Sequence, residues 1–180
     1  CLSPGPEWIQ PTTTSAAEHP PHLKRIALLT SGGDCPGLNP CIRSVVRTAL
    51  ADGIETIGVH RGWRGLIDNE MELMNARSVA GIVNLGGTVL RSSRCPEFRE
   101  AEAREKAASH LLEREIDGLV VIGGNGSLNG ASELARQTNL PLIGIPKTID
   151  NDVGGTDYAL GFDTAVNTAV AAIDKIRDTA

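Results

Sequence analysis

Predominantly apolar runs alternate with amphipathic stretches along most of this 180-residue chain. The apolar runs predict β-strands over residues 25–30, 55–60, 117–122 and 141–145. Strands that are continuously apolar are typical of a parallel sheet that helices cover on both faces. The pattern therefore predicts an α/β fold, a Rossmann-like parallel sheet flanked by helices.

Helical patterns fill the segments between these strands. Asn39 is a candidate N-cap of the first helix, with Pro40 at its first helical position. Residues 97–115 predict a long, solvated amphipathic helix, and Ser127 is a candidate cap of the helix that follows the third strand. The last helix begins near Asp163. Its apolar face is predicted to carry Val166, Ala169, Val170, Ile173 and Ile176.

The two ends of the chain differ from its middle in their sequence pattern. Residues 1–23 hold five of the ten prolines and few apolar residues, so we expect a disordered or loosely packed leader. The folded unit is expected over residues 24–180. The chain begins at Cys1 and stops at Ala180 within a helical pattern, so we expect a fragment of a longer protein.

Composition narrows the function classes. The net charge of −5 argues against a surface that binds nucleic acid. No apolar run reaches the roughly 18 residues that span a bilayer, so a soluble protein without a membrane partner is expected. The four cysteines form no CxxC motif, which favours a reducing cytoplasm over a disulfide framework or a zinc site.

Three of the predicted strands end in distinctive loops. Because the carboxyl ends of parallel strands meet at one edge of a sheet, these loops should open together. Gly32 and Gly33 follow the first strand, and residues 123–127 (GGNGS) follow the third. Such glycines let backbone N–H groups approach a phosphate, although a tight turn alone would also need glycine. Two such loops on one edge favour a cradle for a polyphosphate.

The third loop carries the most chemistry. Residues 146–152 (PKTIDND) place Lys147, Thr148 and two carboxylates after the fourth strand. Asp150 and Asp152 stand two apart, so in extended backbone they would face the same side. One carboxylate that takes a proton from a hydroxyl, with another near a metal, suits phosphoryl transfer. An Asx-rich turn is the equally weighted alternative.

Three arginines are further candidates for contacts with anions. Arg94 follows a glycine-containing segment and would bridge phosphate oxygens, unless it is a surface ion-pair partner. Arg43 and Arg47 stand four apart on the first predicted helix. They would form either a solvated face or an effector-anion site.

Together these segments resemble 6-phosphofructokinase over about residues 24–180. The matching stretches, in order and spacing, are LTSGGDCPGLN (29–39), GWRGL (62–66), GGTVLRSSRCPEF (86–98), VVIGGNGS (120–127) and IPKTIDNDVGGTDYALGFDTA (145–165). The resemblance implies the donor-binding half of that fold. It also implies Mg²⁺-dependent transfer of a phosphoryl group from ATP to the 1-hydroxyl of fructose 6-phosphate, a step of glycolysis.

The resemblance also assigns roles by position. Asp150 would be the base that activates the sugar hydroxyl, with Gly33, Arg94 and Lys147 as further catalytic positions. The donor-binding set would be Gly33, Arg94, Cys95, Gly124, Asn125, Gly126 and Ser127. The substrate-contact set would be Thr148, Ile149, Asp150 and Asp152, and the candidates for metal binding would be Asn125 and Asp152.

Two departures from the family pattern bear on the donor and the metal. Asn125 stands where the family's metal-contacting loop usually carries a carboxylate, which weakens the attraction for Mg²⁺. A small residue at Gly126 leaves room for a nucleotide, whereas Lys147 is common in pyrophosphate-dependent members. ATP is the favoured donor and pyrophosphate the alternative.

The resemblance further implies a homotetramer with an allosteric effector pocket, to which Arg43 and Arg47 would contribute. The family subunit is nearly twice as long as this chain, so the 180-residue chain alone is expected to be inactive. A non-catalytic regulatory subunit, suggested by Asn125, and a kinase of the NAD-kinase kind are the competing functions.

Overall fold

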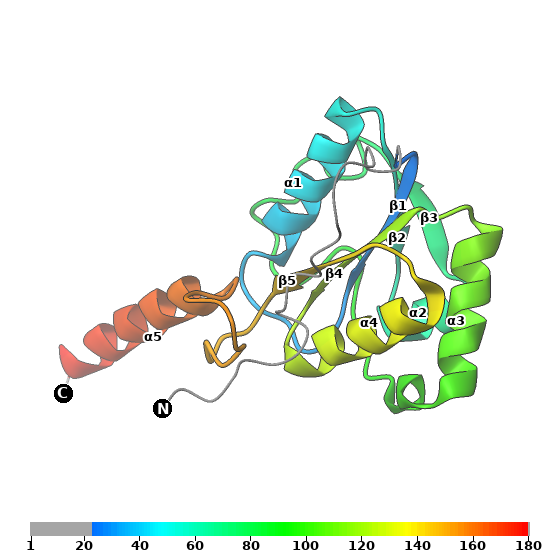
Figure 1. Cartoon of the computed structure of the whole chain (residues 1–180). Helices are drawn as coiled ribbons and strands as arrows, with labels where there is room; N and C mark the ends of the chain where they lie inside the picture. Colours follow the sequence, from blue (N-terminus) through cyan, green and yellow to red (C-terminus); the bar gives the residue numbers. More distant parts are fainter. Residues whose placement is uncertain (1–22, 180) are drawn as a thin grey trace.

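The computed structural model describes residues 23–179, and the expected leader lies almost wholly outside that range. Its centre is a five-stranded sheet in the order β3-β2-β1-β4-β5 (Figure 1). The strands are β1 (Arg25–Thr30), β2 (Glu55–Val59), β3 (Met71–Met74), β4 (Gly118–Gly123) and β5 (Leu142–Pro146). The helices are α1 (Leu38–Ala51), α2 (Trp63–Ile67), the 3₁₀ helix η2 (Pro96–Arg99), α3 (Ala101–Glu113), α4 (Asn125–Thr138) and α5 (Phe162–Arg177).

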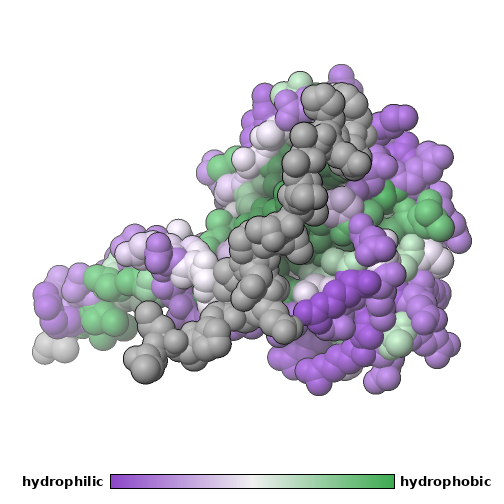
Figure 2. Space-filling model, viewed as in Figure 1, coloured by the Kyte–Doolittle hydropathy of each residue, from purple (hydrophilic) through white to green (hydrophobic). Residues whose placement is uncertain are grey.

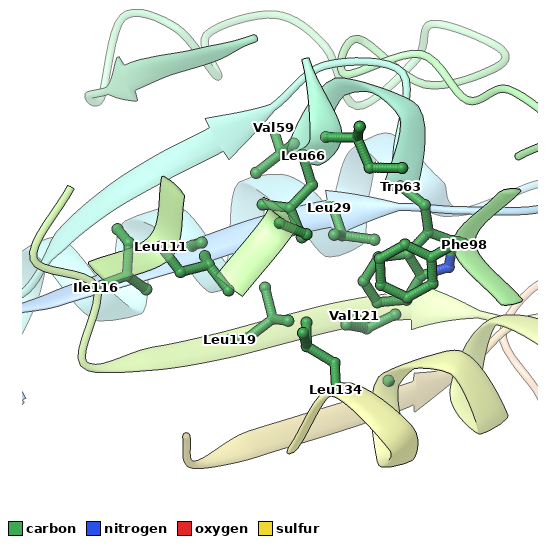
Figure 3. Packing of buried hydrophobic residues seen from close by; sticks show 14 of the residues in the cluster. Leu29, Val59, Trp63, Leu66, Phe98, Leu111, Ile116, Leu119, Val121 and Leu134 are labelled. Carbon is green, nitrogen blue, oxygen red and sulfur yellow. The ribbon is translucent and has the colours of Figure 1, made fainter. Parts of the chain in front are cut away.

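Helices cover both faces of the sheet, as predicted. On strand β1, Ala27 and Leu29 face a core built with α2, α3 and α4, while Ile26 and Leu28 face a core built with α1. Figure 3 shows the first of these cores, where side chains of α2, α3 and α4 meet the strands. The alternation explains why the strand is continuously apolar, since each of its faces is buried.

The sheet is not wholly parallel, which corrects the prediction. Strands β1, β2, β4 and β5 pair in parallel, but β3 runs antiparallel to β2. The sequence pattern did not predict β3, because its four residues include Glu72 and the exposed Leu73. Strand β5 also departs from the prediction. As an edge strand it leaves Ile143 63% exposed, so helices do not cover both of its faces.

Two helix starts differ from the sequence prediction. Helix α1 takes Gly37, at φ 90°, as its N-cap, and makes no side-chain cap bond. Asn39 is buried inside the helix instead, where its amide donates to the carbonyl of Leu85 and accepts from the N–H of Val89. The helix expected over residues 97–115 is shorter, because η2 and the extended backbone of Glu100 precede α3.

Helix α5 begins where predicted but buries none of its residues. It follows a segment that is anchored to the sheet, since Leu160 exchanges backbone hydrogen bonds with Pro146 and Thr148. In Figure 1 the helix extends away from the sheet, and Figure 2 shows hydrophobic side chains along it in green. Within residues 23–179 no helix is both long and apolar enough to cross a membrane.

Candidate functional site

A cavity of about 1000 Å³ opens at the carboxyl ends of β1, β4 and β5. The three loops that the sequence singled out all contribute to its wall, as expected for the ends of neighbouring parallel strands. Of the predicted site residues, those that line it are Gly33, Arg94, Cys95, Gly124, Asn125, Gly126, Ser127, Lys147, Thr148, Ile149, Asp150 and Asp152. The cavity therefore collects the predicted donor, substrate and metal positions into one place.

The loop after β1 turns sharply at Gly32, whose φ of 89° lies in the left-handed region that favours glycine. Ser31 is buried behind the turn, and its N–H donates to the carbonyl of Ile122 on β4. Gly33 is exposed on the cavity wall, and apart from its chain neighbours no described atom lies within 4 Å of the position that a Cβ would take. The loop thus leaves open space beside its backbone, as a phosphate would need.

The second glycine-rich segment is largely helical. Helix α4 begins at Asn125 with Gly124 as its N-cap, so Ser127 does not cap the helix. Ser127 is buried, and its Oγ donates to Ser31 Oγ at 2.9 Å. This bond joins the loop after β1 directly to the glycine-rich segment after β4. The first turn of α4 borders the cavity, and its unpaired N–H groups favour an anion there.

Lys147 is only 5% exposed, and its ammonium donates to the carbonyl of Gly33. Burial lowers the pKa of Lys147, and the nearby Cys35 and Asp34 partly offset that effect. Burial likewise raises the pKa of the Cys35 thiol to about 11, against the attraction of Lys147. Lys147 therefore holds the loop after β1 through a hydrogen bond from its ammonium to a backbone carbonyl.

The acidic loop is held by its own side chains. Thr148 Oγ1 donates to Asp152 Oδ1 at 2.9 Å and accepts from the N–H of Asp150 at 3.1 Å. Asn125 Nδ2 donates to the carbonyl of Asp152 at 3.0 Å, which ties the loop to α4. The backbone is not extended here, because Asn151 has φ 52°. The extended-strand argument for the two carboxylates was wrong, although both carboxylates border the cavity.

The site's oxygen donors suit Mg²⁺. Among residues 23–179 no group of three or more His, Cys, Asp or Glu side chains gathers to hold a metal. A Mg²⁺ site does not require three such side chains, since proteins usually hold this ion through one or two carboxylates together with substrate phosphates. Asp150 and Asp152 border the cavity beside Asn125, whose amide oxygen remains after its nitrogen bonds Asp152. This donor set fits the ion when a phosphate donor completes its shell.

Arg43 and Arg47 are not part of this site. They lie on α1, away from the cavity wall, and one guanidinium nitrogen of Arg43 donates to the carbonyl of Val79 at 2.6 Å. Arg43 therefore has a structural partner, while Arg47 is exposed.

Part of the cavity lining was missed by sequence reasoning. There Trp63 and Phe98 stack with ring centroids 4.1 Å apart, and Gly130 lies against Phe98. The other missed lining residues include Asn129, Glu133, Arg99 and Arg104. A signal existed on α4, because Asn129 and Glu133 follow Asn125 at intervals of four, on the same helix face. The aromatic pair had none, since its members are far apart in sequence.

Comparisons with known proteins agree with this geometry. The sequence model of the phosphofructokinase family matches residues 25–180. The ATP-dependent 6-phosphofructokinase of Persephonella marina is 57% identical over 157 residues, which are 87% of this chain and 48% of that protein. That of Halothermothrix orenii is 52% identical over 158 residues, 88% of this chain and 48% of that protein. The chain thus spans about half the length of the curated relatives it matches.

Solved structures support the same assignment. Phosphofructokinase from Saccharomyces cerevisiae superposes with a TM-score of 0.84 at 35% identity, over 87% of this chain and 24% of that one. The Pichia pastoris enzyme in its T-state gives a TM-score of 0.81 at 34% identity, over 95% and 21%. A pyrophosphate-dependent phosphofructokinase from Marinobacter aquaeolei, at 24% identity and a TM-score of 0.69, shares the fold. Fold, motifs and family match coincide, and this chain belongs to the phosphofructokinase family.

Proposed function

We propose that this chain supplies the donor-binding half of an ATP-dependent 6-phosphofructokinase. The observation that carries the proposal is one cavity that is lined by two joined glycine-rich loops, by Arg94 and by Asp150. Relatives at 52% to 57% identity are named for this activity. The reaction is transfer of the terminal phosphoryl group of ATP to the 1-hydroxyl of fructose 6-phosphate.

Each wall of the cavity has a part in this chemistry. Asp150 accepts the proton of the sugar hydroxyl, whose oxygen then bonds to the terminal phosphorus as ADP leaves. Backbone N–H groups of Gly33 and of the first turn of α4 bind the donor phosphates, and Arg94 binds the transferring group. Mg²⁺, held by Asp152 and Asn125 oxygens, would neutralise charge on the phosphates.

The geometry favours ATP over pyrophosphate. Beyond its chain neighbours and its own helix backbone, no described atom lies within 4 Å of a Cβ built on Gly126, so the wall beside the donor phosphates is open. Lys147, the residue typical of pyrophosphate use, lines the cavity but is only 5% exposed, and its ammonium already donates to the carbonyl of Gly33.

An assay of fructose 1,6-bisphosphate formation, with ATP or pyrophosphate and Mg²⁺, tests the proposal. It is run on the 180-residue chain and on the longest product of its gene. We expect no turnover by the chain alone and ATP-supported turnover by the longer protein. Asp150→Asn should lower kcat by about 100-fold or more, because the proton acceptor is lost. Activity with pyrophosphate alone would contradict the choice of donor.

Absence of turnover with either donor in the longer protein would favour the regulatory alternative, for which Asn125 is the reason. In that case Asn125→Asp should restore a stronger metal ligand and some activity. Assembly as a homotetramer, effector control through Arg43 and Arg47, and a cytoplasmic location stay predictions.

A further inference from the structure

Arg94 reaches the cavity from a long segment without regular structure. Between β3 and η2 the chain forms neither helix nor strand, and Arg94 lies exposed near the end of this stretch. Within the described residues no hydrogen bond or ion pair holds its guanidinium. A free arginine on such a segment would lose much conformational freedom on binding phosphate. Its placement therefore depends on how its neighbours are fixed.

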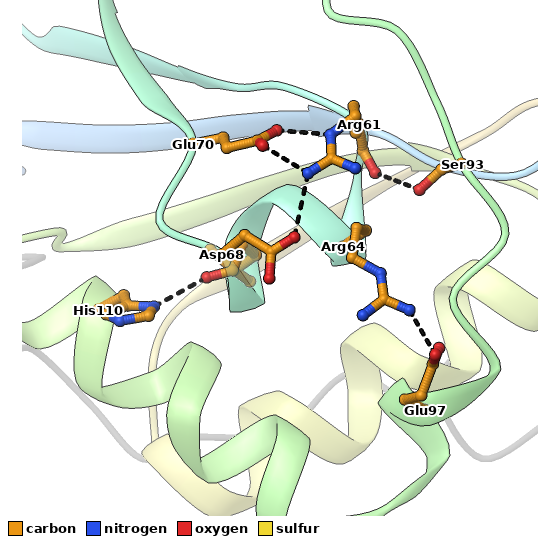
Figure 4. Close-up of polar contacts among 8 residues, drawn as sticks. Arg61, Arg64, Asp68, Glu70, Ser93, Glu97 and His110 are labelled. Atoms are coloured by element: carbon orange, nitrogen blue, oxygen red, sulfur yellow. Dashed lines mark hydrogen bonds and ion pairs between the residues drawn. The ribbon is translucent and has the colours of Figure 1, made fainter.

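The residues before Arg94 are tied to the ends of β1 and β2. Thr30 Oγ1 donates to the carbonyl of Arg91 at 2.9 Å, and Ser93 Oγ donates to the carbonyl of Arg61 at 3.0 Å. Arg61 is itself fixed, because its guanidinium bonds Asp68 and Glu70 (Figure 4). Its backbone is also turned into the left-handed region, at φ 57°.

The residues after Arg94 are tied to α2. Arg64 forms an ion pair with Glu97, as Figure 4 shows, and Phe98 stacks on Trp63 with an interplanar angle of 14°. The backbone N–H of Glu97 and, after it, the Arg64 guanidinium hold the pKa of the Glu97 carboxyl below its usual value. The pair is therefore ionised at neutral pH.

These contacts bracket Arg94 on both sides, and three of them, those of Ser93, Glu97 and Phe98, are made to residues 61–64. We propose that the Ser93–Arg61 hydrogen bond and the Glu97–Arg64 ion pair are positioning contacts, which hold Arg94 at the cavity for the phosphates of the donor. The inference rests on the proposed function, since it assumes that the cavity binds a polyphosphate. Neither Ser93 nor Arg64 matches a position to which the sequence motifs assigned a role.

Binding of inorganic tripolyphosphate with Mg²⁺ to the 180-residue chain, measured by calorimetry, tests the proposal without requiring turnover. Arg94→Ala should weaken binding about tenfold, because a charge-assisted contact is lost. Glu97→Gln and Ser93→Ala should each weaken it about threefold, as expected for partly exposed contacts. In the Arg94→Ala background neither change should have a further effect, since both act through Arg94. The double variant Arg64→Glu with Glu97→Arg, which exchanges the two charges, should bind tripolyphosphate with an affinity within about twofold of that of the wild type.

A matched control separates positioning from a general effect of charge. The side chains of the Arg25–Glu55 pair are 30% and 50% exposed, against 30% and 52% for Arg64 and Glu97. The control pair joins the first residues of β1 and β2, at the end of the sheet that lies opposite the cavity. Glu55→Gln should leave tripolyphosphate binding unchanged. Urea unfolding midpoints of all variants should match that of the wild type.

Each failure has a distinct meaning. A wild-type chain that binds no tripolyphosphate overturns the proposed donor site and this inference with it. The positioning role alone is overturned if the wild type binds tripolyphosphate and Glu97→Gln weakens binding equally in the wild-type and Arg94→Ala backgrounds. Loss of binding in Glu55→Gln, or no recovery in the exchanged pair, does the same.

Discussion

Residues 25–146 and helix α5 both carry clear apolar patterns, but only the first region buries them. The strands place alternate side chains into two cores, one on each face of the sheet. Val170 and Ile173 of α5 stand at the same helical spacing as core residues of α1, yet both are exposed. An apolar stripe thus predicts that a face needs a partner, and does not say whether this chain contains that partner.

The cavity belongs to the packed region and not to helix α5. The cavity wall is anchored in the buried region through Ser31, Ser127 and Lys147, all of which are themselves buried. Helix α5 follows the acidic loop but lines none of that cavity. Phosphate binding should therefore depend on the packed region and be indifferent to α5.

The largest expected effect is in the core. Leu29→Ala removes a fully buried side chain from β1 and should lower the free energy of unfolding by about 3 kcal/mol. Val170→Ala is the matched control on α5, where the same kind of truncation should cost less than about 0.5 kcal/mol. Urea unfolding followed by circular dichroism measures both. Equal losses in the two variants would contradict the contrast.

A smaller effect is expected at Asp117, whose carboxylate accepts the N–H groups of Lys24 and Arg25 at 2.8 and 2.9 Å. These bonds hold the pKa of Asp117 below its usual value. Because the folded pKa is the lower one, the stabilisation is complete above the unfolded pKa and is lost as pH falls through the folded value. Asp117→Asn should cost about 1 kcal/mol at pH 7, where a charged acceptor becomes neutral.

The difference between wild type and Asp117→Asn should shrink as the pH falls below about 4. Asp174→Asn on α5 is the control, since among residues 23–179 the Asp174 carboxylate has only a distant ion pair with Arg177, at 3.9 Å. Thermal unfolding across this pH range measures both variants. A difference that grows toward low pH would show that the sign is wrong.

The smallest effect is expected on α5 itself. Ile173→Glu places a charge on a side chain that is already exposed, so it should change the free energy of unfolding by less than about 0.5 kcal/mol. Leu28→Glu, a fully buried position, should prevent folding in contrast. A loss above about 1 kcal/mol for Ile173→Glu would mean that α5 packs against this chain after all.

Most of the sheet was predictable from sequence because buried strands leave continuous apolar runs. Assembly of the three loops at one edge was also predictable, since parallel strands place their carboxyl ends together. The helix caps were not. Asn39 and Ser127 satisfy local capping rules, but each finds a tertiary partner that competes better. Strand β3 was missed because its four residues are too few to show a periodic pattern. The Trp63–Phe98 stack was missed because a contact between residues far apart in sequence leaves no such pattern.

Hydrogen exchange of the 180-residue chain, with and without Mg²⁺ and ATP, tests the central claim most directly. The account predicts that ATP slows exchange in the segments that line the cavity, residues 31–35, 93–99, 124–130 and 147–152. It predicts no change in α5, residues 162–177. Protection confined to α5, or no protection at the cavity under saturating ATP, would contradict the assignment of this edge as the donor site.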